Sequence, residues 1–277
     1  MLLLVHGTGL NGLAWAPVAE ALLNGSGAQA LEQESPRQLA FDLLRPVAVD
    51  LRGHGSSERS AEGDYDWQRC AEDVLAVTDN FGWEQRSLVG AGHSAGATSL
   101  LLAEAQRPGT FGALWLWEPV IDIPGSGLAK LTAPALAARA RRRKRHFLSV
   151  EDARSHLAGR GIFAEFSQAA FDAFMEGALV RSPAGGWALA CDPSDEALMY
   201  EASALSGAWE RLALVGCPVR VLGGELSAAV PPGDVSAIAE ALPAGEAVAV
   251  AGLGHFGPFQ APNVVADDIG AWALAVP

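Results

Sequence analysis

The sequence predicts an α/β fold: a mostly parallel sheet of about six strands, with helices on both faces and an inserted helical segment. Three observations predict it. Short apolar runs alternate with helix-like segments in the first and last parts of the chain. Several of these runs stop at glycine-containing turns. The middle of the chain breaks the alternation, which indicates an insertion into a single domain.

The core elements follow in order from that alternation. Short runs rich in Leu, Val and Ala indicate buried strands at residues 2–5, 46–50, 87–90, 113–117, 219–222 and 247–250. Helix-like segments lie between them, at residues 14–23, 67–81, 95–106, 232–241 and 262–273. Parallel strands need such crossovers, so we expect six parallel strands in the spatial order 2-1-3-4-5-6.

The middle segment has a different character. It contains no convincing strand and four helix-like stretches, at residues 133–147, 150–158, 168–179 and 193–204. The sequence therefore predicts a core built from residues 1–121 and 215–277, with a helical cap at residues 122–214.

Composition limits the function classes. A chain of 277 residues that is 50% hydrophobic can bury one large core, and a net charge of −13 argues against binding nucleic acid. Three widely spaced cysteines, Cys70, Cys191 and Cys217, favour reduced thiols over disulfides or a metal site. The apolar start is too short for a signal peptide, and no segment reaches bilayer length. We expect a cytoplasmic protein that acts on a small molecule. We also expect it to have no membrane partner, metal or cofactor.

One motif carries most of the chemistry. Gly92-His93-Ser94-Ala95-Gly96 follows an apolar run and precedes a helix-like segment. A serine on such a tight strand–turn–helix junction presents its hydroxyl above the sheet and faces the amino end of the next helix. Backbone N–H groups at that helix end can stabilise an oxyanion. The pentapeptide alone is a weak signal, but its setting makes it specific.

Three further motifs accompany this turn: His6-Gly7-Thr8-Gly9 after the first strand, a loop from Asp50 to Gly55, and Gly252-Leu253-Gly254-His255 after the last strand. In this order the four motifs resemble the α/β-hydrolase family, in its serine-nucleophile branch. The resemblance covers the chain except for the middle segment. It implies an active site at the carboxyl ends of the strands and identifies residues 122–214 as the family's helical cap.

The start of the chain departs from the family. Family members begin with an antiparallel hairpin before the strand that ends in His-Gly, whereas this chain begins at that strand. Either the gene start lies further upstream or the protein lacks the hairpin. Without it, the strand at residues 46–50 would be an exposed edge. Residues 24–45 could cover that edge, or it could pair with a second copy in a homodimer, and the sequence leaves both open.

The resemblance implies Ser94 as the nucleophile and His255 as its base. The family's usual acid position, after the seventh family strand, is occupied by Ser227, which cannot stabilise an imidazolium as a carboxylate does. Some relatives, such as haloalkane dehalogenases, carry the acid at the end of the sixth strand instead. Glu118 stands there, just before Pro119, and is our predicted acid. The alternatives are Glu225, Asp234 or a dyad without an acid.

Backbone N–H groups complete the predicted site. By resemblance, the oxyanion hole uses the N–H groups of Thr8 and Ala95. A serine nucleophile implies an acyl-enzyme, and so esters, lactones or related carbonyl substrates, as for a carboxylesterase or lactonase. An acyltransferase or perhydrolase would share these motifs, as would a ligand-binding protein of this fold with little turnover.

The predicted cap carries a basic run. Six cations stand close together in it: Arg139, Arg141, Arg142, Arg143, Lys144 and Arg145. At helical spacing they cannot all face one pocket. They form either a solvated basic face or a face from which one arginine reaches inward to an anionic substrate group. Nearby aromatic residues, Phe163, Phe166, Phe171, Phe174 and Trp187, indicate a cap core or an apolar underside.

Overall fold

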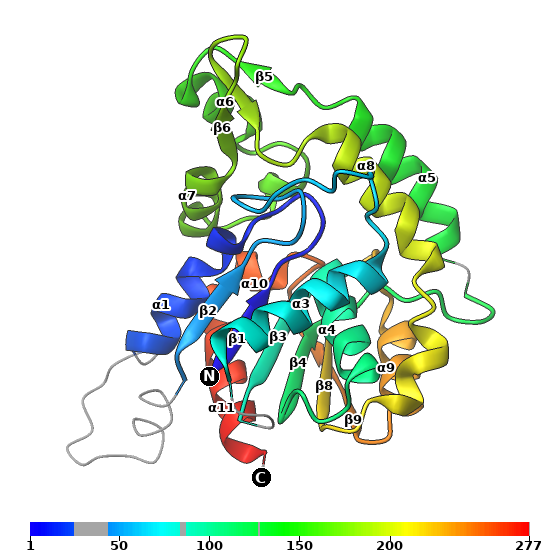
Figure 1. The fold of residues 1–277 in the computed structure, drawn as a ribbon. Coiled ribbons are helices and arrows are strands. Elements are labelled where there is room, and N and C mark those ends of the chain that lie inside the picture. The colour runs from blue at the N-terminus through cyan, green and yellow to red at the C-terminus, as the bar shows by residue number, and fades with distance from the viewer. Residues whose placement is uncertain (25–43, 84–86, 127, 277) are drawn as a thin grey trace.

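A computed structural model describes residues 1–24, 44–83, 87–126 and 128–276. Six strands form one sheet in the order β2-β1-β3-β4-β8-β9, and every neighbouring pair is parallel (Figure 1). The strands are β1 Leu2–Val5, β2 Pro46–Val49, β3 Val89–His93, β4 Ala113–Trp117, β8 Val219–Gly224 and β9 Gly245–Val250. Counting these six strands in chain order, this is 2-1-3-4-5-6, so the predicted fold is confirmed. Strands β2 and β9 are the edges.

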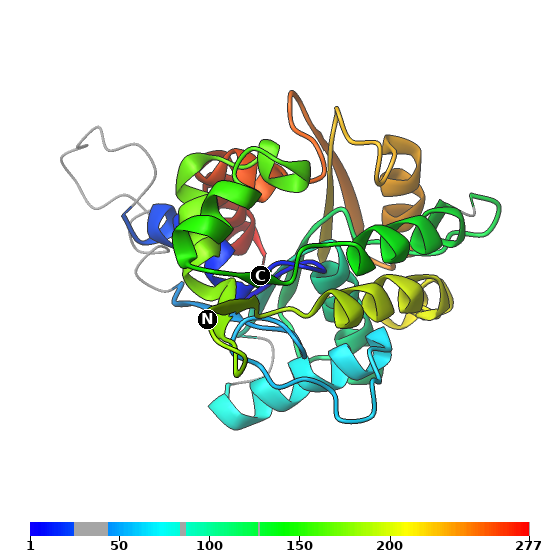
Figure 2. The ribbon, with the colours of Figure 1, turned by 90° about the horizontal axis from the view of Figure 1, so that it is seen from above.

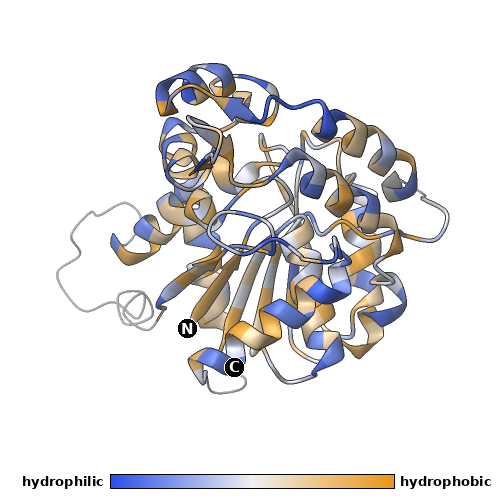
Figure 3. Cartoon of the chain, turned by 45° about the horizontal axis from the view of Figure 1, so that its top comes forward, coloured by the Kyte–Doolittle hydropathy of each residue, from blue (hydrophilic) through white to orange (hydrophobic). Residues whose placement is uncertain are grey.

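The inner strands β1, β3, β4 and β8 are largely buried, and their side chains alternate between the two faces of the sheet. Leu3 and Val5 of β1 belong to one hydrophobic cluster, and Leu2 and Leu4 belong to the other. The first cluster includes residues of α3 Trp67–Phe81, α4 Ala95–Gln106 and α9 Pro232–Ala241. The second includes residues of α1 Ala16–Asn24 and α11 Pro262–Ala275. Figure 3 shows the central strands coloured as mostly hydrophobic between these two helical layers.

Local capping explains why α3 begins and ends where the sequence predicts. The Asp66 carboxylate accepts a hydrogen bond from the Gln68 N–H at the start of α3, and Gly82, at φ 61°, ends the helix. The predicted helices at 67–81, 95–106 and 232–241 have the observed bounds. The predicted helix at 14–23 is instead a 3₁₀ turn, η1 Gly12–Trp15, followed by α1.

Residues 122–214 contain helices, 3₁₀ turns and three short strands. The helices are α5 Leu128–Arg141, α6 Val150–Leu157, α7 Gln168–Gly177 and α8 Pro193–Ala202. The 3₁₀ turns are η2 Gly161–Ala164, η3 Ser203–Leu205 and η4 Trp209–Leu214. The strands β5 His146–Phe147, β6 Leu179–Arg181 and β7 Trp187–Leu189 form an antiparallel sheet in the order β5-β7-β6.

The expectation that this segment holds no strand is therefore wrong. Strands of two or three residues are too short to show the alternation by which a strand is recognised in a sequence. The predicted helix at 133–147 likewise ends at Arg141, and its last two residues belong to β5.

Specific contacts hold residues 122–214 against the rest of the chain. Asn11 Nδ2 donates to the carbonyl of Phe174 in α7 at 2.9 Å, and Trp67 Nε1 donates to the carbonyl of Met199 in α8 at 3.0 Å. Helices α5 and α8 pack side by side, as Figure 2 shows from above. We keep the name cap for residues 122–214.

The connection at residues 24–45, one of the two possibilities for covering the β2 edge, falls mostly on residues 25–43, outside the described residues. In the part that the structure describes, no helix is both long enough and apolar enough to cross a bilayer.

Candidate active site

Ser94 occupies the sharp turn between β3 and α4, with φ 54° and ψ −120°. The turn requires glycines because the backbone is packed closely around it. A Cβ on Gly96 would lie 2.4 Å from the carbonyl oxygen of Val5, and a Cβ on Gly92 would lie 2.7 Å from Cα of Ala97. The strand–turn–helix setting predicted for the motif is therefore present, and the amino end of α4 lies directly after the serine.

Glu118 lies immediately after β4 and is fully buried. Three groups contact its carboxylate. Oε1 accepts from the Gly224 N–H at 2.9 Å, and Oε2 accepts from Ser227 Oγ at 2.7 Å. Oε2 also lies 2.6 Å from Nδ1 of His255. A buried carboxylate is costly unless it is hydrogen-bonded, and these partners satisfy both of its oxygens.

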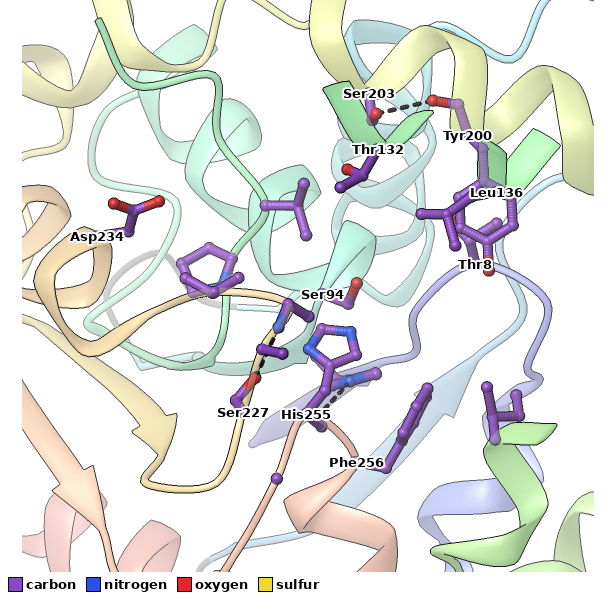
Figure 4. A pocket seen from close by; sticks show the side chains of 18 of the residues that line it. Thr8, Ser94, Thr132, Leu136, Tyr200, Ser203, Ser227, Asp234, His255 and Phe256 are labelled. Carbon is purple, nitrogen blue, oxygen red and sulfur yellow. Dashed lines mark hydrogen bonds between the residues drawn. The ribbon is translucent and has the colours of Figure 1, made fainter. Parts of the chain in front are cut away.

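His255 precedes the short helix α10 Gly257–Gln260, and its side chain is 17% exposed. An ionised carboxylate can only accept, so the contact with Glu118 places a proton on Nδ1 and leaves Nε2 as an acceptor. Ser94 and His255 line the same cavity, and both side chains project into it in Figure 4. Within the described chain no direct hydrogen bond joins them, and such contacts are often loose before substrate binds.

The two alternative acids have other partners, although Asp234 lines the same cavity as Ser94 and His255. Glu225 accepts a hydrogen bond from the Gly252 N–H at 3.2 Å, and Asp234 accepts one from Ser126 Oγ at 3.0 Å. Neither has a contact with His255 among the described interactions. The sequence identified Ser227 as the residue at the family's usual acid position, but it did not reveal that the Ser227 hydroxyl donates to Glu118.

Two other histidines support the turns around the site. His6 Nε2 accepts from the Leu51 N–H at 3.0 Å, and its Nδ1 lies 2.8 Å from the carbonyl of Gly7. His54 Nε2 accepts from the Gly9 N–H at 3.0 Å. Burial lowers the pKa of both rings, that of His6 to about 3, so both are neutral. Each ring thereby holds the turn that carries Thr8.

His93, which directly precedes Ser94, supports the loop that carries His255. Its Nε2 lies 3.0 Å from the carbonyl of His255, and its ring lies against Phe256 and Phe259. Burial lowers the pKa of His93, so the neutral ring donates from Nε2 to that carbonyl. This hydrogen bond therefore holds the backbone of the loop that carries His255 in place.

Thr8 and Ala95 are the two residues whose backbone N–H groups we predicted for an oxyanion hole. Thr8 lines the cavity, and Ala95 is the first residue of α4. Neither backbone N–H has an acceptor among the described residues, as is usual for the first N–H groups of a helix. Unpaired backbone N–H groups of this kind can bind an oxyanion.

The cavity measures about 530 Å³ and lies between the sheet and the cap. Core residues Val120, Ile121 and Phe256 line it together with cap residues Leu136 and Tyr200. Figure 4 shows Leu136, Tyr200 and Phe256 around the cavity. A mainly apolar cavity with a few polar groups is typical of a small-molecule site. No cluster of metal-ligating side chains occurs in the described parts of the chain.

The cysteines lie apart from this site. All three thiols are free and buried. Burial raises the pKa of Cys70 and of Cys217 to about 12, and raises that of Cys191 as well. Such thiols stay protonated and unreactive.

Most of the basic run at the end of α5 is neutralised by carboxylates. The pairs are Arg141 with Glu201, Arg143 with Glu196, Lys144 with Asp152 and Arg145 with Asp192. Arg139 is different, because its side chain lines the cavity that holds Ser94. Of the aromatic residues, Phe163, Phe171 and Phe174 are buried in the cap, while Phe166 stacks on Phe259 with ring centroids 5.0 Å apart.

The sequence profile of the alpha/beta hydrolase family matches residues 2–268. Lipase LipV of Mycobacterium tuberculosis is 31% identical over 145 residues, which are 51% of this chain and 51% of that protein. The chain thus aligns with about half the length of this curated relative.

Two solved structures share the fold over nearly the whole chain. The E-2-(acetamidomethylene)succinate hydrolase has a TM-score of 0.77 at 20% identity, covering 98% of this chain and 90% of its own. The malate-bound esterase from Thermogutta terrifontis has a TM-score of 0.70 at 23% identity, covering 99% and 89%.

Proposed function

Because the chain belongs to the alpha/beta hydrolase family, we propose that it is a serine hydrolase for a small ester, lactone or related carbonyl substrate. In this proposal Ser94 is the nucleophile, His255 the base and Glu118 the acid. The relative named as a lipase and the neighbour named as an esterase support the ester class. Residues 122–214 serve as the cap over the substrate.

The first half-reaction forms an acyl-enzyme. Ser94 Oγ attacks the carbonyl carbon while its proton moves to Nε2 of His255. Glu118 stabilises the imidazolium through Nδ1, and the N–H groups of Thr8 and Ala95 bind the oxyanion. The bond between the carbonyl carbon and the leaving oxygen then breaks, and that oxygen takes the proton from Nε2. An acyl group remains on Ser94.

The second half-reaction uses water. A water molecule attacks the acyl carbon and gives its proton to Nε2 of His255. The second tetrahedral intermediate collapses, Ser94 Oγ regains a proton from Nε2, and the carboxylic acid leaves. An alcohol in place of water would give acyl transfer by the same steps, so product analysis with water alone and with added alcohol distinguishes the two reactions.

One observation carries this proposal most strongly. Nδ1 of His255 lies 2.6 Å from the buried carboxylate of Glu118, while the same histidine shares a cavity with a serine on a strand–turn–helix junction. A buried pair of this kind, aimed at a serine, orients the imidazole for proton transfer.

The proposal is tested by kinetics on p-nitrophenyl esters and lactones. We expect Ser94→Ala, His255→Ala and the double variant each to lose about 10⁴-fold or more in kcat, because the members of such a unit are not additive. A fluorophosphonate probe should label wild type and not Ser94→Ala. Retained turnover in Ser94→Ala would disprove the mechanism.

The acid is tested separately. Glu118→Gln should lower kcat by roughly 10²–10⁴-fold, because a neutral amide does not stabilise the imidazolium. The matched control is Glu225→Gln, which changes the carboxylate nearest to Ser227 in sequence and should keep wild-type kcat. Equal losses in the two variants would count against Glu118 as the acid.

A further inference from the structure

A second cavity, of about 270 Å³, adjoins the first under the cap. Five residues border both cavities: Leu136, Arg139, Gly161, Ile162 and Tyr200. They come from α5, η2 and α8, so the two cavities meet at a wall made entirely by the cap. Arg139 therefore borders both the cavity that holds Ser94 and the second cavity.

The lining of the second cavity is strongly basic. It includes Arg139, Arg143, Lys144 and Arg160, against one carboxylate, Glu196. Two of these cations are already neutralised, since Arg143 pairs with Glu196 and Lys144 with Asp152. Within the described residues, Arg139 and Arg160 have no carboxylate partner. An excess of positive charge in one concavity is unusual for a chain whose net charge is −13.

The position of Arg139 follows from a glycine opposite it. Gly161 has a φ of 57°, and a Cβ there would lie 2.9 Å from Nη2 of Arg139. The absence of a side chain at this position leaves room for the guanidinium at the shared wall. Arg139 can therefore reach a ligand group that lies at this shared wall.

Two carboxylates also line the larger cavity: Glu165, which directly follows η2, and Asp234 of α9. Glu165 accepts a hydrogen bond from Gln260 Nε2 at 3.2 Å, and Asp234 accepts one from Ser126 Oγ. The unpaired positive charge is instead concentrated where α5 meets η2. A negatively charged substrate group is therefore attracted to that wall.

We propose that Arg139 and Arg160 bind a carboxylate or phosphate of the substrate while its scissile carbonyl lies at Ser94. The planar guanidinium fork matches both anions, and an arginine without a carboxylate partner is available for such a group. The inference rests on the proposed function and narrows its substrates to anionic esters or thioesters. These are half-esters of dicarboxylic acids, or acyl compounds whose leaving group carries a phosphate.

Binding is tested without turnover. We titrate the Ser94→Ala protein with glutarate and with inorganic phosphate by calorimetry, and repeat this with Arg139→Met or Arg160→Met added. The matched control is Arg142→Met, on the exposed end of the same run and outside both cavities. We expect binding to weaken about 10- to 100-fold in the first two variants and to persist in the control. Tighter binding of glutarate would indicate a half-ester of a dicarboxylic acid as the substrate. Tighter binding of phosphate would indicate a leaving group that carries a phosphate.

Turnover tests the same site independently. With wild-type Ser94, we measure kcat/KM for a mono-p-nitrophenyl ester of glutaric acid and for the neutral p-nitrophenyl valerate. The ratio of anionic to neutral substrate should fall about tenfold or more in Arg139→Met, and should stay at the wild-type value in Arg142→Met. Anion binding that is absent, or equal in all variants, would overturn the inference. Hydrolysis that survives Ser94→Ala would overturn the proposed function instead.

Discussion

At the scale of single residues, two backbone conformations stand out. In the described part of the chain, Ser94 and Glu118 are the non-glycine residues with a positive φ, at 54° and 46°. Ser94 follows β3, and Glu118 follows the neighbouring strand β4. The two strained residues are therefore the ones that share a cavity or a hydrogen bond with His255. Non-glycine residues keep such conformations only where the surroundings enforce them, and they cluster at functional sites.

The strain at Ser94 predicts an unusual order of stability. Ser94→Gly should be about 1 kcal/mol more stable than Ser94→Ala. Glycine removes the strain of the positive φ, and this gain exceeds the destabilisation that comes from the greater entropy of glycine in the unfolded chain. Urea unfolding of both inactive variants measures the difference. Ser155, exposed on α6, is the control: there the glycine variant should be the less stable one, by about 1 kcal/mol. The same order at both sites would mean that position 94 carries no strain.

Ser227 should act by positioning Glu118. Its hydroxyl donates to the oxygen that contacts His255, so Ser227→Ala should lower kcat roughly tenfold, through loss of one hydrogen bond to a charged group. Ser227→Thr keeps the hydroxyl and should retain most of the activity. If both variants lose activity equally, the hydroxyl has no part in the effect. Ser227→Asp in the Glu118→Gln protein tests whether a carboxylate at this position can restore the contact with His255.

At the scale of elements, sequence reasoning succeeded where the signal is local. The core strands and the helix at 67–81 have apolar patterns and caps that depend on adjacent residues alone. Glu118 was proposed as the acid because Ser227 occupies the usual position. The hydrogen bond between them was not foreseeable, since it depends on how the ends of β4 and β8 lie in space. The strands of the cap were missed because they are too short to form a pattern.

The pairing of α5 with α8 should depend on one buried ion pair. Arg143 of the segment after α5 contacts Glu196 of α8, whose side chain is 7% exposed. Removing one partner of a buried pair leaves an uncompensated charge, so Glu196→Ala should lower the free energy of unfolding by about 2–4 kcal/mol. Glu201→Ala is the control, because it removes the exposed pair with Arg141 and should change stability little. Similar losses by denaturant unfolding in both variants would contradict this.

At the scale of the whole molecule, buried neutral histidines join distant segments. His6 links the first turn to Leu51, His54 links the loop after β2 back to Gly9, and His93 links β3 to the loop of His255. Each ring keeps a lowered pKa because burial disfavours its charged form. Protonating any of them opposes the native arrangement of the site.

Stability should therefore fall in acid. Because the folded-state pKa of His6 is about 3 and the ordinary value is 6.5, the unfolded chain binds more protons between those values. The free energy of unfolding should fall as the pH drops below about 6.5, by up to about 1.4 kcal/mol per pH unit for each such histidine. Urea unfolding at several pH values measures the slope. His6→Gln should flatten it, whereas the exposed His146→Gln should not.

The insertion of the cap between β4 and β8 also affects how the protein is made. Leu114 of β4 pairs with Val219 of β8, which leaves the ribosome about 100 residues later. At a synthesis rate of about 5–20 residues per second, the β4 edge waits about 5–20 s for its neighbour. During that interval an apolar strand with two tryptophans, Trp115 and Trp117, has one unpaired edge. The nascent chain should therefore depend on chaperones until β8 has emerged.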